Sequence, residues 1–228
     1  GRLRYSGGWS WCGLIQMFKA VLWDFGGVVT ASPFEAFNRF EEANDLPSDT
    51  IRRINADCPD TNAWAQLESN QITVDEFDAA FAAEAEALGH QIQGRQVLEL
   101  LSGEVRPEMV RALELIKESF RIGCITNNVR SGKGPGMATS ESRASEVKAA
   151  MALFDLVVES SKVGIRKPDP EIYQLACREL DISPEEAVYL DDLGINLKPA
   201  RALGMTTIKV LSAAQALDDL EALGIACR

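Results

Sequence analysis

The segment KAVLWDFGGVVT (residues 19–30) joins a short apolar run to an aspartate and a glycine pair. Residues 19–23 have the length and composition of a buried strand, and Gly26 and Gly27 signal the loop that follows. Asp24 is therefore expected at the carboxyl end of this strand. Four further runs of the same kind predict buried strands at residues 120–125, 155–158, 187–190 and 206–211.

Helical patterns separate these predicted strands. Two of them place their apolar residues on one face, namely Met109, Leu113 and Ile116 in the first and Ile172, Leu175, Ala176 and Leu180 in the second. Strands that alternate with helices predict an α/β fold with a Rossmann-like, doubly wound parallel sheet. In such a sheet, ligands gather at the carboxyl ends of the strands.

The first two predicted strands are too far apart in the sequence for an ordinary strand-to-helix connection, so a subdomain is inserted between them. Phenylalanines recur at helical spacing at positions 34, 37 and 40, and again in the alanine-rich stretch DEFDAAFAAEAEAL (residues 75–88). We therefore expect a helical cap over residues 33–103 and a core formed by residues 17–32 and 104–228. Residues 129–145 are rich in Gly and Ser and are expected to form a mobile loop.

Composition excludes several classes of function. The 228 residues are 46% hydrophobic and carry a formal net charge of −11, which favours a globular protein and disfavours nucleic acid as a partner. The single histidine, His90, leaves little material for histidine-based catalysis or a histidine metal site. The five cysteines are an odd number without a close pair, which is typical of neither a disulfide framework nor a zinc site.

We expect a cytoplasmic protein that does not enter a membrane. No stretch reaches the roughly 20 uninterrupted apolar residues that a membrane span needs. The scattered cysteines suit a reducing compartment. Residues 1–16 lack the small-residue cleavage site of a signal peptide and are interpreted as a tag or an over-long start, with Met17 as the natural beginning.

Polar side chains cluster at the predicted strand ends. They are Asp24, the sequence TNN at residues 126–128, Lys167 in KVGIRKPDPEIY (residues 162–173), and the pair Asp191 and Asp192 in VYLDDLGIN (residues 188–196). Strand ends of one parallel sheet meet at one crevice, so three carboxylates and a lysine are expected to converge. Such carboxylates repel one another unless a cation offsets them, and hard oxygen ligands suit Mg²⁺. A lysine beside Mg²⁺ is suited to binding a phosphate dianion.

These four clusters, in this order, resemble the motifs of the haloacid dehalogenase superfamily over residues 18–211. The stretches KVGIRKPDPEIY and VYLDDLGINLKPARALGM are most similar to the phosphatase-like domain at the N-terminus of soluble epoxide hydrolases and to small sugar-phosphate phosphatases. The resemblance implies a Rossmann-like core, a helical cap inserted after the first motif and a magnesium-dependent site for phosphoryl transfer.

The resemblance also implies roles for the residues that react with the phosphoryl group. Asp24 would be the nucleophile that forms an aspartyl-phosphate. Thr126 and Asn127 would bind the phosphoryl oxygens, and Lys167 would offset charge on both the nucleophile and the phosphate.

The remaining implied roles concern the metal ion. Asp24, Asp192 and the backbone carbonyl of Gly26 would hold Mg²⁺. Asp191 would orient Lys167 or a metal-bound water, and Asn196 would support the ligands from the next layer of residues.

Gly26 departs from the commonest pattern of this superfamily. Most of its phosphatases have a second aspartate two residues after the nucleophile, which protonates the leaving oxygen and later activates water. Glycine cannot transfer a proton, and general acid–base help is typically worth about 10²–10⁴ in rate. The sequence therefore predicts slow turnover, a substrate with a good leaving group or a proton relay from the cap.

The leading hypothesis is an enzyme, a magnesium-dependent phosphatase that acts on a small organic phosphate monoester. The first alternative is a haloacid dehalogenase or phosphonatase-type hydrolase, since such enzymes also lack the second aspartate. The second is a catalytically dormant module that binds a phosphate or another metabolite. The sequence leaves open the identity of the substrate and whether the protein is a monomer or a dimer.

Overall fold

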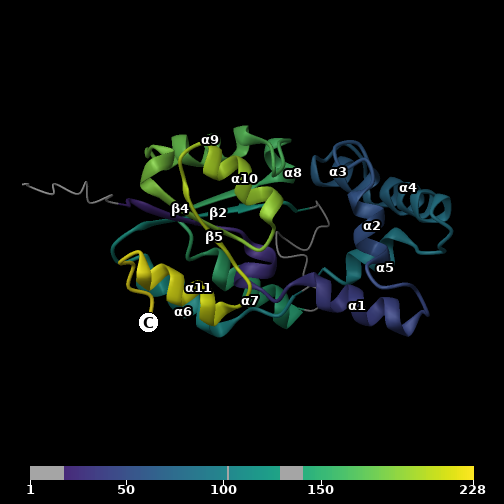
Figure 1. Ribbon diagram of the computed structural model, residues 1–228, viewed down its shortest axis with the longest axis horizontal. Coiled ribbons are helices and arrows are strands. Elements are labelled where there is room, and N and C mark those ends of the chain that lie inside the picture. Colours follow the sequence, from purple (N-terminus) through teal and green to yellow (C-terminus); the bar gives the residue numbers. More distant parts are fainter. Residues whose placement is uncertain (1–17, 102, 129–140) are drawn as a thin grey trace, which may run out of the picture.

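The computed structural model describes residues 18–101, 103–128 and 141–228, and its core is one parallel sheet covered by helices on both faces (Figure 1). The strand order is β3-β2-β1-β4-β5, which is a doubly wound arrangement with β1 at the centre. The strands are β1 (Ala20–Trp23), β2 (Arg121–Thr126), β3 (Leu156–Glu159), β4 (Ala187–Asp191) and β5 (Thr206–Lys209). The predicted fold class is confirmed, and each strand lies within one or two residues of its predicted position.

Two hydrophobic clusters, one on each face, fix the sheet between its helices. Val21 and Trp23 of β1 pack on one side, whereas Ala20 and Leu22 pack on the other, as the alternation of a strand requires. In Figure 1, α6 and α11 lie below the sheet and α9 and α10 above it. The core helices are α6 (Pro107–Ile116), α7 (Glu141–Met151), α8 (Ser160–Val163), α9 (Pro170–Glu179), α10 (Gly194–Ala202) and α11 (Ala213–Ala222), with short turns η1 (Phe25–Val29) and η2 (Pro184–Glu186).

A separate group of helices lies between η1 and α6 and forms the right-hand part of Figure 1. Their own hydrophobic cluster includes Phe37, Ile51, Phe77 and Phe81. Local signals start them: Ser32 caps the first helix, and Thr73 and Glu76 form a capping box at the fourth. The helices are α1 (Pro33–Ala43), α2 (Thr50–Ala56), α3 (Ala63–Glu68), α4 (Val74–Ala87) and α5 (Gly94–Glu99). We call α1–α5 the cap.

The chain enters and leaves the cap through two adjacent segments. Thr30 and Val105 form an antiparallel bridge, and the N–H of Ala31 donates to the carbonyl of Glu104 at 2.8 Å. The N–H of Arg106 donates to the carbonyl of Val29 at 2.9 Å. The two connections between cap and core are thus hydrogen-bonded to each other.

One expectation about secondary structure is partly wrong. Residues 141–145, which we expected in a mobile loop, belong to the start of α7, because Val147 and Ala150 of this helix are buried against the sheet. Residues 129–140 and the expected N-terminal extension 1–16 lie outside the described residues. Within the described ranges, no helix is both long and apolar enough to cross a membrane, and the four cysteines found there form no disulfide.

Candidate active site

The site lies at the carboxyl edge of the three central strands. Asp24 directly follows β1, Thr126 ends β2 and Asp191 ends β4. Trp23 is in register with Cys124 of β2 and Leu190 of β4, so Asp24 and Asp191 lie level with each other, and Thr126 lies one residue further along β2. The N–H of Asp24 donates to the Leu190 carbonyl at 2.8 Å, which anchors the aspartate to the sheet.

Lys167 links two of these carboxylates. Its Nζ lies 2.8 Å from Oδ1 of Asp24 and 2.9 Å from Oδ2 of Asp191. The Asp24 Oδ1 also accepts the N–H of Phe25 at 2.6 Å. The lysine side chain is 1% exposed and both carboxylates are buried, so these contacts are shielded from water and little screened.

Asp191 is fixed by donors on both of its oxygens. Besides Lys167, the phenol of Tyr189 donates to Oδ2, and the Asn196 amide donates to each oxygen at 3.1 Å. The N–H of Leu193 donates to Oδ1 at 2.8 Å. Asp191 is thus suited to orienting Lys167. Tyr189 was not among the predicted site residues because its place in an apolar strand indicates only a core residue.

Burial and mutual charge shift the pKa values of these groups. Burial raises the pKa of Asp24, and the neighbouring Asp191 and Asp192 raise it further against the opposing effect of Lys167. Burial lowers the pKa of Lys167, but the carboxylates of Asp191 and Asp24 outweigh it and raise the pKa above its ordinary value. Lys167 is therefore a permanent cation at neutral pH.

Asp192 lies beside the glycine pair that follows β1. Its Oδ2 accepts the hydroxyl of Ser32 at 3.4 Å. A Cβ at Gly27 would lie 2.3 Å from Oδ2 of Asp192, and Gly27 has a φ of +79°. Both the close approach and the left-handed backbone require glycine at position 27. Burial, followed by the charge of Asp191, raises the pKa of Asp192 to about 6.

The three carboxylates could hold a metal ion. Asp24, Asp191 and Asp192 each offer an oxygen, and these oxygens lie within 4.8 Å of one another. When all three are ionised, Lys167 offsets one of the three negative charges, so a net charge of −2 remains. A hard divalent cation would neutralise it, and carboxylate oxygens are ligands that Mg²⁺ prefers. The donor set therefore fits the predicted ion.

The side chain of Asn127 is held by the loop that carries Lys167. Its Oδ1 accepts the N–H of Lys167 at 2.8 Å, and its Nδ2 donates to the Lys167 carbonyl at 3.0 Å. We call this two-way contact the Asn127–Lys167 clamp. Nδ2 also donates to Glu68 of the cap at 3.2 Å. The adjacent Thr126 is buried at the end of β2.

Gly26 has an ordinary backbone conformation and open space around it. Its φ and ψ are −68° and 127°, and a Cβ at this position would meet no atom within 4 Å. Neither strain nor crowding among the described residues therefore requires glycine at the position where the resembling phosphatases have their second aspartate.

Strand β3 contributes a further carboxylate that the sequence analysis missed. Glu159 ends this strand, is buried, and accepts the side-chain amide of Asn128 at 2.8 Å. The oxygen of that amide accepts the hydroxyl of Ser161 at 2.9 Å. Glu159 directly follows the predicted strand at residues 155–158, just as Thr126 and Asp191 directly follow theirs, so the sequence carried the signal that would have found it.

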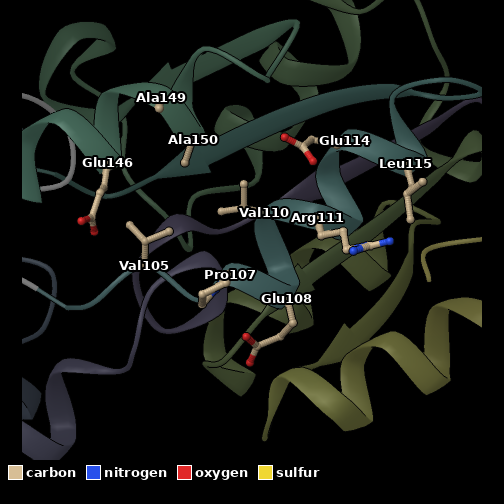
Figure 2. A pocket seen from close by; sticks show the side chains of 10 residues that line it. All are labelled: Val105, Pro107, Glu108, Val110, Arg111, Glu114, Leu115, Glu146, Ala149 and Ala150. Atoms are coloured by element: carbon tan, nitrogen blue, oxygen red, sulfur yellow. The ribbon is translucent and has the colours of Figure 1, made fainter.

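A surface pocket of about 750 Å³ lies elsewhere, between α6 and α7. Figure 2 shows the side chains that line it, among them Val105, Val110 and Glu146. None of the predicted site residues is among its lining residues, so this pocket is separate from the carboxylates around Lys167.

Comparison with protein families gives a match to the haloacid dehalogenase-like hydrolases over residues 18–204. Among curated proteins, the chain is 33% identical to mouse acyl-CoA dehydrogenase family member 10 over 96% of its own length, and 31% identical to mouse bifunctional epoxide hydrolase 2 over 89%. It spans only 20% and 38% of those two proteins. It is also 26% identical to the sesquiterpene phosphatase AstK of Aspergillus oryzae, over 82% of this chain and 87% of that protein.

Solved structures share the fold at low sequence identity. A haloacid dehalogenase-family enzyme of Bacteroides thetaiotaomicron, in complex with magnesium and inorganic phosphate, has a TM-score of 0.55 at 21% identity and covers 84% of this chain and 93% of its own. The L-2-haloacid dehalogenase of Xanthobacter autotrophicus has a TM-score of 0.58 at 18% identity, covering 92% and 85%. These likenesses show the fold alone, so the reaction must be argued from the site.

Proposed function

The chain belongs to the haloacid dehalogenase-like hydrolase family, and on that premise we propose that it is a magnesium-dependent phosphatase of a small organic phosphate monoester. The observation that carries the proposal is the buried Lys167 ammonium, which binds Asp24 and Asp191 while Asp192 lies alongside. This arrangement combines a carboxylate nucleophile with positive charge for a phosphate dianion. The phosphatase named among the relatives supports the same reaction.

Asp24 would attack the phosphorus atom of the substrate. One of its oxygens, Oδ1, is held by Lys167 and by the N–H of Phe25, which leaves Oδ2 as the attacking atom. The new bond from Oδ2 to phosphorus forms as the bond to the leaving oxygen breaks, giving an aspartyl-phosphate and an alkoxide that takes a proton from water. Water then attacks this phosphorus, releases inorganic phosphate and restores the Asp24 carboxylate.

The other residues would stabilise the transferring phosphoryl group. Lys167 and the hydroxyl of Thr126 would bind its oxygens, together with the backbone N–H of Asn127, whose side chain is occupied by the clamp. Asp191 and Asn196 would keep the ammonium of Lys167 in place.

Asp24, Asp192 and the Gly26 carbonyl would hold Mg²⁺. When bound, the ion supplies positive charge that lowers the repulsion between the carboxylates and the incoming phosphate. The net charge of −2 that Lys167 leaves uncompensated supports this assignment. It also favours a phosphatase over a dehalogenase, because a dehalogenase needs no metal and would leave that charge buried without a counter-ion.

Hydrolysis of p-nitrophenyl phosphate, with Mg²⁺ or with chelator, tests the proposal. We expect metal-dependent turnover in the wild type, its loss in Asp24→Asn, and wild-type rates in the control Asp218→Asn, whose carboxylate is exposed and pairs with Arg228. Absence of turnover in the wild type, with halide release from a 2-haloacid, would assign the protein to the dehalogenases. Absence of both reactions, with phosphate binding by calorimetry, would identify a dormant binding module.

A further inference from the structure

The contact between the cap and the catalytic loops is concentrated on one carboxylate. Glu68, the last residue of α3, is buried, with a side chain that is 9% exposed. Its Oε2 accepts a hydrogen bond from Nε of Arg166 at 2.8 Å and one from the Asn127 amide at 3.2 Å, and it forms an ion pair with Nη2 of Arg166 at 2.6 Å. One oxygen of the cap therefore receives two hydrogen bonds, one from each of two loops of the core, and takes part in an ion pair.

Both of those loops carry residues of the active site. Arg166 directly precedes Lys167, and Asn127 directly follows Thr126. Arg166 makes a second contact with the cap, because its Nη1 donates to the carbonyl of Pro59 at 3.1 Å. Both loops that carry active-site residues are thus in direct contact with the cap.

The connection continues to the nucleophile through the clamp. The amide that donates to Glu68 also donates to the Lys167 carbonyl, and the oxygen of the same amide accepts the Lys167 N–H. The backbone of Lys167 in turn sets where its ammonium meets Asp24. Without the carboxylate, the half-buried guanidinium of Arg166 loses its charged partner, and the Asn127 amide loses one acceptor.

We propose that Glu68 is a positioning residue that couples the seating of the cap to the Asn127–Lys167 clamp. The active site is then fully ordered only while α3 is in contact with the core. The catalytic part of this inference rests on the proposed phosphatase function, whereas its structural part concerns the Lys167 backbone and is measured without substrate.

Hydrogen–deuterium exchange tests the structural part on the full chain. We expect the amides of residues 162–172 to exchange about tenfold faster in Glu68→Ala, because the hydrogen bond from the Lys167 N–H to Asn127 opens more often. The matched control is Glu84→Ala, since Glu84 accepts the Ala63 N–H at the other end of α3 and makes none of the contacts of Glu68 with the core loops. Unchanged exchange in Glu68→Ala, or an equal change in Glu84→Ala, would overturn the proposal.

Kinetics with p-nitrophenyl phosphate test the catalytic part. We expect kcat to fall by about 10–10² in Glu68→Ala with little change in KM, since a small misplacement of catalytic groups has an effect of this size. Glu68→Gln keeps an acceptor for Asn127 and Arg166 and should stay within a few-fold of the wild type. The double variant Glu68→Ala with Arg166→Ala should be no slower than Glu68→Ala.

The outcomes separate this inference from the proposed function. If Glu68→Gln is as slow as Glu68→Ala, the hydrogen-bond acceptor at position 68 does not set the rate, and the positioning role is wrong. If the wild type hydrolyses no phosphate, the phosphatase proposal fails while the exchange measurement still decides the structural coupling. If Glu68→Ala does not fold, exchange in Arg166→Ala gives the decision instead: faster exchange of residues 162–172 supports the coupling, and wild-type exchange contradicts it.

Discussion

On the proposed phosphatase function, substituting Gly26 by aspartate should raise the rate of phosphate-ester hydrolysis. The backbone at residue 26 has φ −68° and ψ 127°, which any residue can adopt, and a Cβ would meet no atom within 4 Å. The added carboxyl group would lie two residues after the nucleophile and could protonate the leaving oxygen. The substitution therefore supplies the acid that the chain lacks without straining the fold.

The expected size of the rate increase follows from the general acid that glycine at position 26 does not supply. General acid–base catalysis contributes about 10²–10⁴ in rate, so kcat/KM for an alkyl phosphate should rise by about that factor in Gly26→Asp. For p-nitrophenyl phosphate, whose leaving group needs no proton, we expect little change. Loss of glycine from an unstrained position should stabilise the fold by about 0.4–1 kcal/mol, opposed by the charge of the new carboxylate near Asp24 and Asp192.

The assay is kcat/KM for a series of phosphate monoesters with leaving groups of rising pKa. The wild type should slow steeply along the series, and Gly26→Asp should slow much less. Gly26→Asn is the control, because it has nearly the same volume and no proton to transfer. The reasoning is refuted if alkyl phosphates gain no more from Asp than from Asn, or if the dependence on leaving-group pKa is the same as in the wild type.

Two further predictions concern the surroundings of Asp192. Gly27→Ala should lower magnesium-dependent turnover by at least about tenfold, because the new Cβ would displace the Asp192 carboxylate. Gly224→Ala is the control, since Gly224 also has a positive φ but has open space around it. This variant should lose only about 1–2 kcal/mol of the free energy of unfolding through backbone strain, as measured by thermal unfolding. An unchanged magnesium dependence in Gly27→Ala would contradict the placement of the metal. Burial raises the pKa of Asp192 to about 6, so the folded protein binds the proton of this carboxyl group more tightly than the unfolded chain does. With chelator present, protonated Asp192 should therefore contribute fully to the free energy of unfolding below about pH 4. This contribution should be lost as the pH rises through 6. Mg²⁺ needs ionised carboxylates, so its affinity by calorimetry should fall below pH 6, and Asp192→Asn should weaken this pH dependence, which Asp24 retains.

The strands and their terminal carboxylates could be predicted because both depend on short-range signals. An apolar run of four to six residues followed by Asp and Gly specifies a strand and its end. Parallel pairing then brings Asp24 and Asp191 to the same edge without any knowledge of side-chain packing. The predicted strand ends were accurate only to within one or two residues, and Glu159, which directly follows a predicted strand in the same way, carried the same short-range signal.

The residues that sequence reasoning missed act through contacts that only the folded chain creates. Tyr189 lies in an apolar strand and Glu68 ends a short helix, so neither pattern indicates a role in the site. Gly27 was interpreted only as part of a loop, whereas its φ of +79° and its approach to Asp192 require glycine. The start of α7 was missed because its polar sequence favours a loop, and packing of Val147 on the sheet outweighs that preference.

The hydrogen-bonded pair of connections at Ala31 and Glu104 makes the cap a separable structural module. Because the insertion starts and ends at adjacent points, its own length hardly affects the core, and the entropy of closing the loop grows only slowly with added residues. The helices of the cap can therefore be lengthened, shortened or exchanged without displacing Asp24 or the strands of the core. A chimaera joined at these two residues, with the cap of one relative on the core of another, would transfer substrate preference as a unit, provided that the incoming cap supplies an acceptor for Arg166.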